Sequence, residues 1–255
     1  MFYLYANISQ MKERLNILAS GGGSTGSEII KSWLRKEIPN LEDIFITSSK
    51  EKAGIIQKAL DLGIPKKNII TINPDDFRDP ITKKVDQDRF GAAILKFAEK
   101  NGVTFITQNG WMPYTPSNVI EKFEGKIFNQ HPAPVPEFGG QGMFGRRPHQ
   151  AIIEFSRLTG RSSLWTEVIG QRVAIEYDAG VVVGSARVPF TLDDNGDTLQ
   201  QRALPFEHQV QINVVKDFTT DSLIEIYRTE PIVLPGQEDA LIEAKRIAKE
   251  MYPEG

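Results

Sequence analysis

The sequence predicts an α/β protein with a Rossmann-like, open and mostly parallel sheet, helices on both of its faces and an antiparallel edge. Two observations carry this prediction. Short apolar runs alternate with stretches of helical period through the first half of the chain, and the connections between them are short. Two further apolar runs then follow one another across a turn, which is typical of antiparallel strands added to a parallel core.

The individual elements follow from the same two periods. Strands are expected where apolar and β-branched residues cluster, and helices where apolar residues recur every three or four positions. In the first half of the chain the expected strands are 15–19, 44–47, 68–72, 103–107 and 126–129, and the expected helices are 28–36, 51–62, 86–100 and 117–123.

The segment 130–148 interrupts this alternation. It holds four prolines and four glycines in nineteen residues and follows neither period. An irregular stretch of this length inside a compact domain is commonly functional. The elements expected after it are a helix at 149–157, strands at 162–169, 172–177 and 181–188 with a turn at 178–180, and helices at 198–215 and 238–251.

Composition argues against several classes of function. The 255 residues include 30 Lys and Arg against 33 Asp and Glu, a net charge of −3, so no basic field attracts nucleic acid or an anionic membrane. With no cysteine and three widely spaced histidines, we expect no metal site. We expect a cytoplasmic protein, because the first ten residues lack the features of a signal peptide and no apolar run is long enough to span a membrane.

A glycine cluster follows the first expected strand. Gly21, Gly22, Gly23 and Ser24 stand just before a helix, where backbone N–H groups and the helix dipole favour an anion such as phosphate. The glycines also fit the dinucleotide pattern G-x-G-x-x-G, but the second strand ends without the acid that would bind a ribose. The pattern therefore favours phosphate, with a plain turn as the alternative.

Two polar side chains, Asn129 and His131, stand at the end of the fifth expected strand. Because they are two residues apart they point to one side, at the edge where open α/β sheets bind ligands. An amide and a protonated imidazole can both donate to a developing oxyanion. Asp178, in the expected turn, would keep the imidazole charged if it lay nearby, and spacing along the chain leaves that proximity open.

Several motifs together resemble those of the folate-dependent formyltransferases. Their order over residues 15–215 is most similar to the members that formylate glycinamide ribonucleotide in purine synthesis. The motifs are SGGGS at 20–24, NQHP at 129–132, GGQGMFG at 139–145, His149, DAG at 178–180 and LPFEH at 204–208.

The resemblance implies the formyltransferase fold, with no metal, and a role for each matched residue. The implied roles are catalysis for Asn129, His131 and Asp178, binding of the acceptor's phosphate by Gly21, Gly22, Gly23 and Ser24, binding of its ribose by Glu207, and binding of the pterin of 10-formyltetrahydrofolate by Gly110, Trp111 and Met112. The alternative for Glu207 is a position on a solvated helix surface, and the alternative for Trp111 and Met112 is packing in the core.

The resemblance also divides the chain. Residues 1–10 form an N-terminal extension and 11–216 the formyltransferase catalytic domain. Residues 217–255 form a C-terminal extension that packs on the same domain, or on a second copy of the chain in a homodimer.

Other functions stay open. The acceptor could be the amine of a sugar nucleotide or, in a formyl-folate hydrolase, water, and the chain could be a non-catalytic nucleotide-binding protein. Two departures from the family pattern bear on substrate binding. Leu164 stands where a histidine usually precedes the acid, and Pro113 stands where a basic residue is usual.

Overall fold

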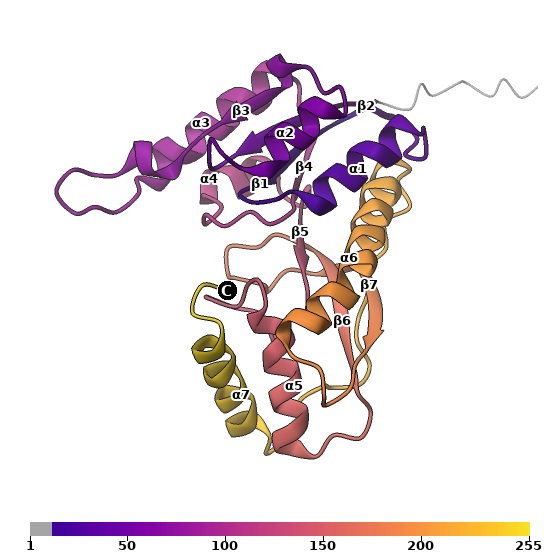
Figure 1. The fold of residues 1–255 in the computed structure, drawn as a ribbon. Coiled ribbons are helices and arrows are strands. Elements are labelled where there is room, and N and C mark those ends of the chain that lie inside the picture. The colour runs from indigo at the N-terminus through magenta and orange to yellow at the C-terminus, as the bar shows by residue number, and fades with distance from the viewer. Residues whose placement is uncertain (1–11) are drawn as a thin grey trace, which may run out of the picture.

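The computed structural model describes residues 12–255 around one seven-stranded sheet of order β3-β2-β1-β4-β5-β6-β7 (Figure 1). The strands from β1 to β5 are parallel and the last two pairings are antiparallel, as the sequence predicts. The expected extension at 1–10 lies outside the described residues. The strands are β1 (Glu13–Ala19), β2 (Leu41–Ser48), β3 (Ile69–Thr71), β4 (Phe105–Gln108), β5 (Ile127–His131), β6 (Trp165–Arg172) and β7 (Val182–Pro189).

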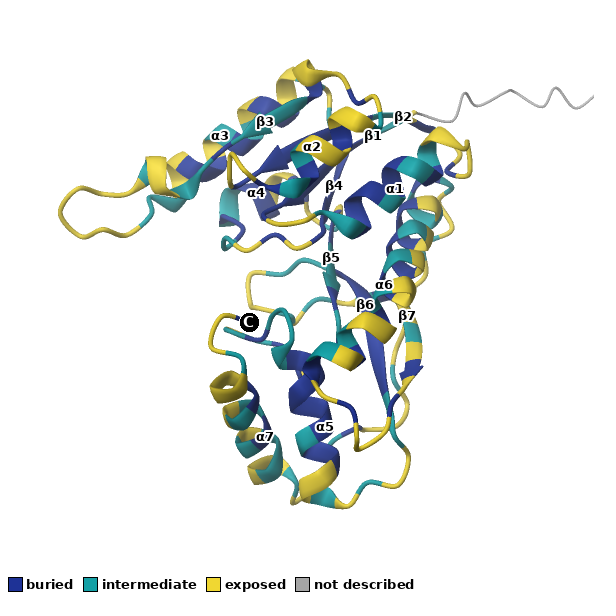
Figure 2. Ribbon diagram, viewed as in Figure 1, coloured by how far each residue is buried: buried dark blue, intermediate teal, exposed yellow. Residues whose placement is uncertain are grey.

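Helices cover both faces of the sheet. Leu15 and Ile17 of β1 pack in one apolar cluster with residues of α1, α2, α5 and α6, whereas Leu18 packs in a second cluster with residues of α3 and α4. Alternate side chains of one strand thus feed opposite faces, as expected for a parallel sheet buried on both sides (Figure 2). The helices are α1 (Ser24–Leu34), α2 (Gly54–Asp61), α3 (Gln87–Lys100), α4 (Ser117–Lys122), α5 (Arg147–Thr159), α6 (Gly196–Thr219) and α7 (Glu238–Met251).

The strand order reverses between β1 and β4, which defines the edge where a ligand crevice is expected. The chain leaves β1 toward β2 on one side, and β4 then pairs with the other side of β1. Ligands of open α/β sheets bind where the strand order reverses in this way, beyond the carboxyl ends of the strands. The backbone N–H of Ser20 after β1 donates to the carbonyl of Gly110 after β4 at 3.0 Å, which joins the two loops at this edge.

The first helix begins earlier than its apolar period predicts. Helix α1 starts at Ser24, directly after Gly23, whose φ of 65° lies in the left-handed region. A glycine adopts that φ without the strain of a Cβ, so the chain turns straight from the loop into the helix. The N–H groups at the start of α1 therefore belong to the glycine cluster itself.

The antiparallel edge differs from the prediction in one element. The expected separate strand at 172–177 is wrong: β6 continues to Arg172, and residues 173–181 form an irregular connection to β7. The reason is the register of the sheet. Arg172 already pairs with Phe128 near the start of β5, so the residues after it soon lose their pairing partner. Asp178 stands in this connection with a φ of 53°.

The last helix lies beside α5. Ala244 and Ala248 of α7 are fully buried in the same cluster as Ile152 of α5, while the opposite side of α7 is exposed (Figure 2). The guanidinium of Arg147 at the start of α5 donates to the carbonyls of Tyr252 and Pro253 just after α7.

Within residues 12–255, no helix combines the length and the apolar character needed to cross a membrane.

Gly23 provides a test of how the glycine loop is built. A Cβ at this position would lie 2.5 Å from the Cβ of Ile55, and the φ of 65° adds strain. We expect Gly23→Ala to lower the free energy of unfolding by about 2 to 4 kcal/mol, measured by urea denaturation. Gly21→Ala is the control, because nothing lies within 4 Å of its added methyl group. Equal effects of the two substitutions would contradict this account of the loop.

Candidate active site

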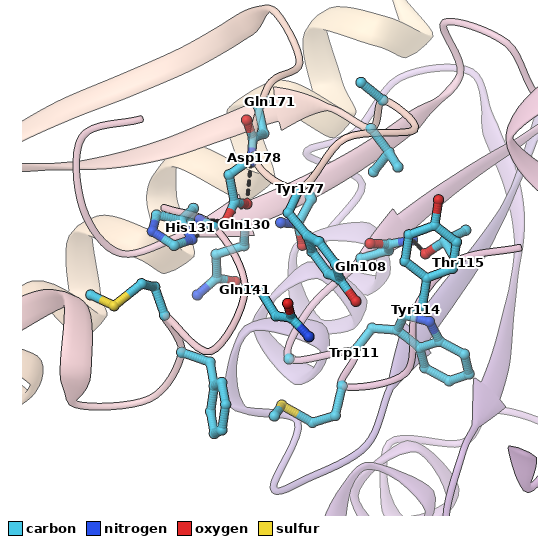
Figure 3. A pocket seen from close by; sticks show the side chains of 18 of the residues that line it. Gln108, Trp111, Tyr114, Thr115, Gln130, His131, Gln141, Gln171, Tyr177 and Asp178 are labelled. Carbon is cyan, nitrogen blue, oxygen red and sulfur yellow. Dashed lines mark hydrogen bonds and ion pairs between the residues drawn. The ribbon is translucent and has the colours of Figure 1, made fainter. Parts of the chain in front are cut away.

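A cavity of about 540 Å³ opens beyond the carboxyl ends of β4 and β5 (Figure 3). Its walls come from the segment after β4, the end of β5, the loop 140–145 and helix α6, together with residues 171–178 at the end of β6 and in the connection that follows it. Segments far apart in the sequence therefore meet at this edge of the sheet. The predicted site residues that line the cavity are Gly110, Trp111, Met112, Asn129, His131, Asp178 and Glu207.

His131 and Asp178 lie together in this cavity. The imidazole Nδ1 is 3.6 Å from the carboxylate Oδ1, and the two side chains are 4% and 10% exposed. The other ring nitrogen, Nε2, is 3.2 Å from the backbone oxygen of Phe138. Because a carbonyl only accepts, Nε2 carries a proton in this contact, and the ring satisfies both neighbours only when Nδ1 is protonated as well.

The carboxylate of Asp178 is held on both oxygens. Oδ2 accepts from the backbone N–H of Gly140 at 2.8 Å, and Oδ1 accepts from the side-chain amide of Gln171 at 2.7 Å (Figure 3). These two bonds fix the plane of the carboxylate relative to the imidazole. Gln171, only 2% exposed, is a site residue that the sequence analysis missed.

Burial opposes the charge of His131. Removal of the ring from water lowers the pKa of His131 below its usual value near 6.5, and this effect exceeds the opposing influences of Asp178 and the Phe138 carbonyl. Burial thus opposes the charge that Asp178 favours on the ring. The carboxylate lies close enough to favour the charge, but both groups are desolvated together.

Asn129 lines the cavity from β5, between the neighbouring strands β4 and β6. It pairs with Gln108 of β4 on one side and with Gln171 of β6 on the other. It is two residues from His131 on β5, so the two side chains share one face of the strand. Gln130 between them turns to the opposite face, where its amide donates to Glu207 of α6.

Glu207 is a buried acid, not a solvated residue of a helix surface. It is 6% exposed, and burial raises its pKa to about 7 despite the hydrogen bond from Gln130. The fully buried His149 on α5 approaches it, with 3.9 Å between Nε2 and Oε1. Burial lowers the pKa of His149 to about 3, so this imidazole is neutral at pH 7. Glu207 therefore changes its charge near neutral pH at the edge of the cavity.

The glycine loop does not line the cavity itself but is bonded to its wall. The hydroxyl of Ser20 accepts from the N–H of Met112 at 2.9 Å and from the hydroxyl of Ser49. No side chain caps the N-terminus of α1, and its first turn contains no acidic residue. Backbone donors at this helix start thus face no competing carboxylate of their own helix, which suits an anion.

Aromatic side chains form the wall opposite the polar groups. Trp111 stacks on Phe90 at 6.2 Å between ring centroids and is 9% exposed, so it is part of the core as well as of the cavity. Met112 beside it is 49% exposed. Tyr114 and Tyr177, which the sequence analysis did not select, pack edge to face at 5.4 Å. The Tyr114 hydroxyl also donates to the carbonyl of Ile175, which ties this wall to the connection that carries Asp178.

Within the described residues, no three His, Cys, Asp or Glu side chains gather as a metal site would require.

Comparison with known proteins identifies relatives of this arrangement. A family model described as "Formyl transferase" matches residues 13–215. The chain is 26% identical over 205 residues to the chloroplastic phosphoribosylglycinamide formyltransferase of Arabidopsis thaliana, covering 80% of this chain and 64% of that protein. It is 25% identical over 211 residues to the phosphoribosylglycinamide formyltransferase of Haemophilus influenzae, covering 83% of this chain and 89% of that protein.

A solved structure is similar over nearly the same span. The phosphoribosylglycinamide formyltransferase of Brucella melitensis has a TM-score of 0.68 and 25% sequence identity, covering 84% of this chain and 100% of that one. The predicted fold class is confirmed by this likeness and by the sheet order. Helix α7 lies beyond the residues that the family model matches.

The raised pKa of Glu207 predicts a pH-dependent stability. The folded protein keeps this carboxyl protonated up to about pH 7, whereas the unfolded chain releases the proton near 4.5. This contribution to the free energy of unfolding is therefore present below pH 4.5 and is lost as the pH rises to 7. Relative to Glu207→Gln, we expect the wild type to lose up to about 3 kcal/mol across this window, measured by urea unfolding. The exposed Glu124→Gln serves as the control, and a wild-type curve parallel to that of Glu207→Gln would refute a raised pKa.

Proposed function

This chain belongs to the formyl transferase family, and we propose that it transfers a formyl group from 10-formyltetrahydrofolate to the amine of glycinamide ribonucleotide, a reaction of de novo purine biosynthesis. The observation that carries the proposal is the meeting of Asn129, His131 and Asp178 at one cavity. The printed names of the relatives support this choice of acceptor.

The proposed chemistry uses the two kinds of polar group at the end of β5. The acceptor amine attacks the formyl carbon, and the carbonyl oxygen becomes an oxyanion. Asn129 and His131 donate hydrogen bonds to that oxygen. Asp178 takes the proton from the attacking amine, directly or through water, and passes it to the folate nitrogen as the carbon–nitrogen bond breaks. The formyl group thus exchanges one nitrogen for another with no change of oxidation state.

The environment of His131 suits this role during the reaction. In the free protein its Nε2 contacts the Phe138 carbonyl at 3.2 Å, the long end of the normal range, and a substrate oxygen placed at the ring would take over this donor. Burial disfavours the imidazolium before the substrate binds. A negative oxyanion beside the ring reverses that balance, because an opposite charge in a desolvated site is strongly stabilising. The donor is therefore strongest in the transition state.

Two further features support a phosphorylated ribose as the acceptor. The uncapped start of α1, with Gly21, Gly22, Gly23 and Ser24, would bind the phosphate through backbone N–H groups. Glu207, which lines the cavity from α6, would accept hydrogen bonds from the ribose hydroxyls. The bond between Ser20 and Met112 holds the glycine loop beside the cavity.

The co-substrate fits the remaining wall. The pterin of 10-formyltetrahydrofolate is a flat heteroaromatic ring, and Gly110, Trp111 and Met112 line the cavity opposite the polar groups. Gly110 has a φ of 75° and carries no side chain, so its backbone can approach a flat ligand closely.

The direct test is an acceptor panel. Purified protein is incubated with 10-formyltetrahydrofolate and glycinamide ribonucleotide, with an amino-sugar nucleotide, or with buffer alone, and formylated product and free formate are separated by chromatography. We expect formylation of glycinamide ribonucleotide. Preferred formylation of the sugar nucleotide would overturn the acceptor, and formate release without any acceptor would indicate a hydrolase.

His131→Ala separates chemistry from binding. Loss of one donor to an oxyanion typically raises the barrier by about 3 to 4 kcal/mol, so we expect kcat to fall by roughly 10² to 10³. The Kd for glycinamide ribonucleotide, measured by calorimetry, should change little, because the acceptor's phosphate and ribose are bound elsewhere. His208→Ala is the control, since His208 does not line the cavity. Near-wild-type turnover of His131→Ala would remove this residue from the mechanism.

A further inference from the structure

Helix α7 places a lysine beside the loop that contacts Asp178. It lies outside the family-matched residues 13–215, yet its Lys245 reaches the loop that carries Gly139 and Gly140. The Lys245 ammonium donates to the carbonyl oxygen of Gly139 at 3.0 Å. Lys245 does not line the cavity. Its hydrogen-bonded link to the cavity is therefore the loop.

One peptide group connects Lys245 to Asp178. The carbonyl of Gly139 and the N–H of Gly140 belong to the same peptide unit, and that N–H donates to Oδ2 of Asp178 at 2.8 Å. A cation on the carbonyl oxygen draws electron density through the amide and makes its N–H a stronger donor. The peptide is thus held between an ammonium on one side and a carboxylate on the other.

The loop has little freedom to hold this peptide otherwise. A Cβ on Gly139 would lie 2.6 Å from the Cβ of Asp178, so the backbone passes Asp178 more closely than a residue with a side chain allows. The guanidinium of Arg147 donates to the Gly142 carbonyl at 2.8 Å and to two carbonyls just after α7. Loop and helix are therefore tied together at both Gly139 and Gly142.

Burial and neighbouring charges shift the pKa of Lys245 in opposing directions. Burial and the neighbouring Lys249 lower the pKa of Lys245, while Asp178 and Glu137 oppose that shift. On the other side of the peptide, His131 faces Asp178 and also feels the Lys245 charge, which disfavours the imidazolium. His149 on α5 feels the charge of His131 in turn. Lys245 thus belongs to the same electrostatic cluster as the catalytic groups.

We propose that Lys245 is a positioning residue of the active site, which orients the carboxylate of Asp178 through the Gly139–Gly140 peptide. The inference rests on the proposed function for its kinetic consequence, but the hydrogen bond that it concerns can be measured without turnover. In this account α7 is part of the machinery that aligns the proton-transferring group.

The test follows the Gly140 amide and the turnover together. The variants are Lys245→Met, which removes donor and charge, Lys245→Gln, which keeps a neutral donor, and Lys245→Arg, which keeps both. Arg246→Met is the matched control, because it removes an exposed cation of the same helix that pairs with Glu243 and Glu250 of α7. The amide proton of Gly140 is observed by NMR in the free protein, and kcat and KM are measured with glycinamide ribonucleotide and 10-formyltetrahydrofolate.

We expect the Gly140 amide proton to move upfield in Lys245→Met, and by less in Lys245→Gln, because the peptide is less polarised. The value of kcat should fall about tenfold in Lys245→Met with KM for glycinamide ribonucleotide unchanged, and Lys245→Arg should restore most of it. Arg246→Met should match the wild type in both measurements. If Lys245→Met does not fold, the Gly140 amide proton shift and the kcat of Lys245→Gln test the proposal instead.

Three results would overturn the proposal: a Gly140 signal equal to that of the wild type in a folded uncharged variant, an altered signal with unchanged kcat, or an equal effect of Arg246→Met. Failure of the proposed function is distinguishable. If the wild type itself formylates no glycinamide ribonucleotide, that function falls, while the position of the Gly140 signal still decides whether Lys245 polarises this peptide.

Discussion

The carboxylate of Asp178, only 10% exposed at the cavity, is held by two donors, and the geometry of the site follows from that constraint. A buried carboxylate is costly unless donors satisfy both of its oxygens. Gly140 and Gln171 supply those donors from two different segments, and they leave Oδ1 facing His131. The loop 139–145 and the end of β6 are thereby fixed relative to β5, so one desolvated charge organises three parts of the chain.

The same constraint explains why the connection after β6 is irregular. Asp178 reaches His131 from a backbone with a φ of 53°, which a continued strand does not supply. The chain leaves the sheet at Arg172 and enters the cavity wall, where Tyr177 packs against Tyr114. Residues 173–181 lack the strand pairing of the sheet, and contacts such as that between Tyr177 and Tyr114 hold them at the cavity wall. A functional residue on such a segment is placed by the rigid sheet beneath it.

Local sequence patterns were enough to predict the fold class and to select the glycine cluster, Asn129 and His131. The glycine cluster follows β1 and the pair Asn129 and His131 ends β5, and parallel strands end at one edge, so their placement at that edge was predictable. The meeting of Asp178 with His131 was expected only by resemblance, because it depends on a nine-residue connection without a period. Gln171 was missed because the strand was expected to end at 169, which placed this residue outside the sheet. Lys245 had no signal, since its partner is a backbone carbonyl.

Burial is the quantity that the sequence least reveals, and here it governs three ionisable groups. It raises the pKa of Glu207 to about 7 and lowers that of His149 to about 3, while in His131 it outweighs a neighbouring carboxylate. The free site therefore carries less charge than its residue types suggest. A ligand group of opposite charge favours the ionised form of the residue that it contacts, because the low-dielectric surroundings strengthen the interaction. For the proposed reaction we infer that substrate binding and proton placement are coupled in this cavity, and that the coupling arises from desolvation and not from any one hydrogen bond.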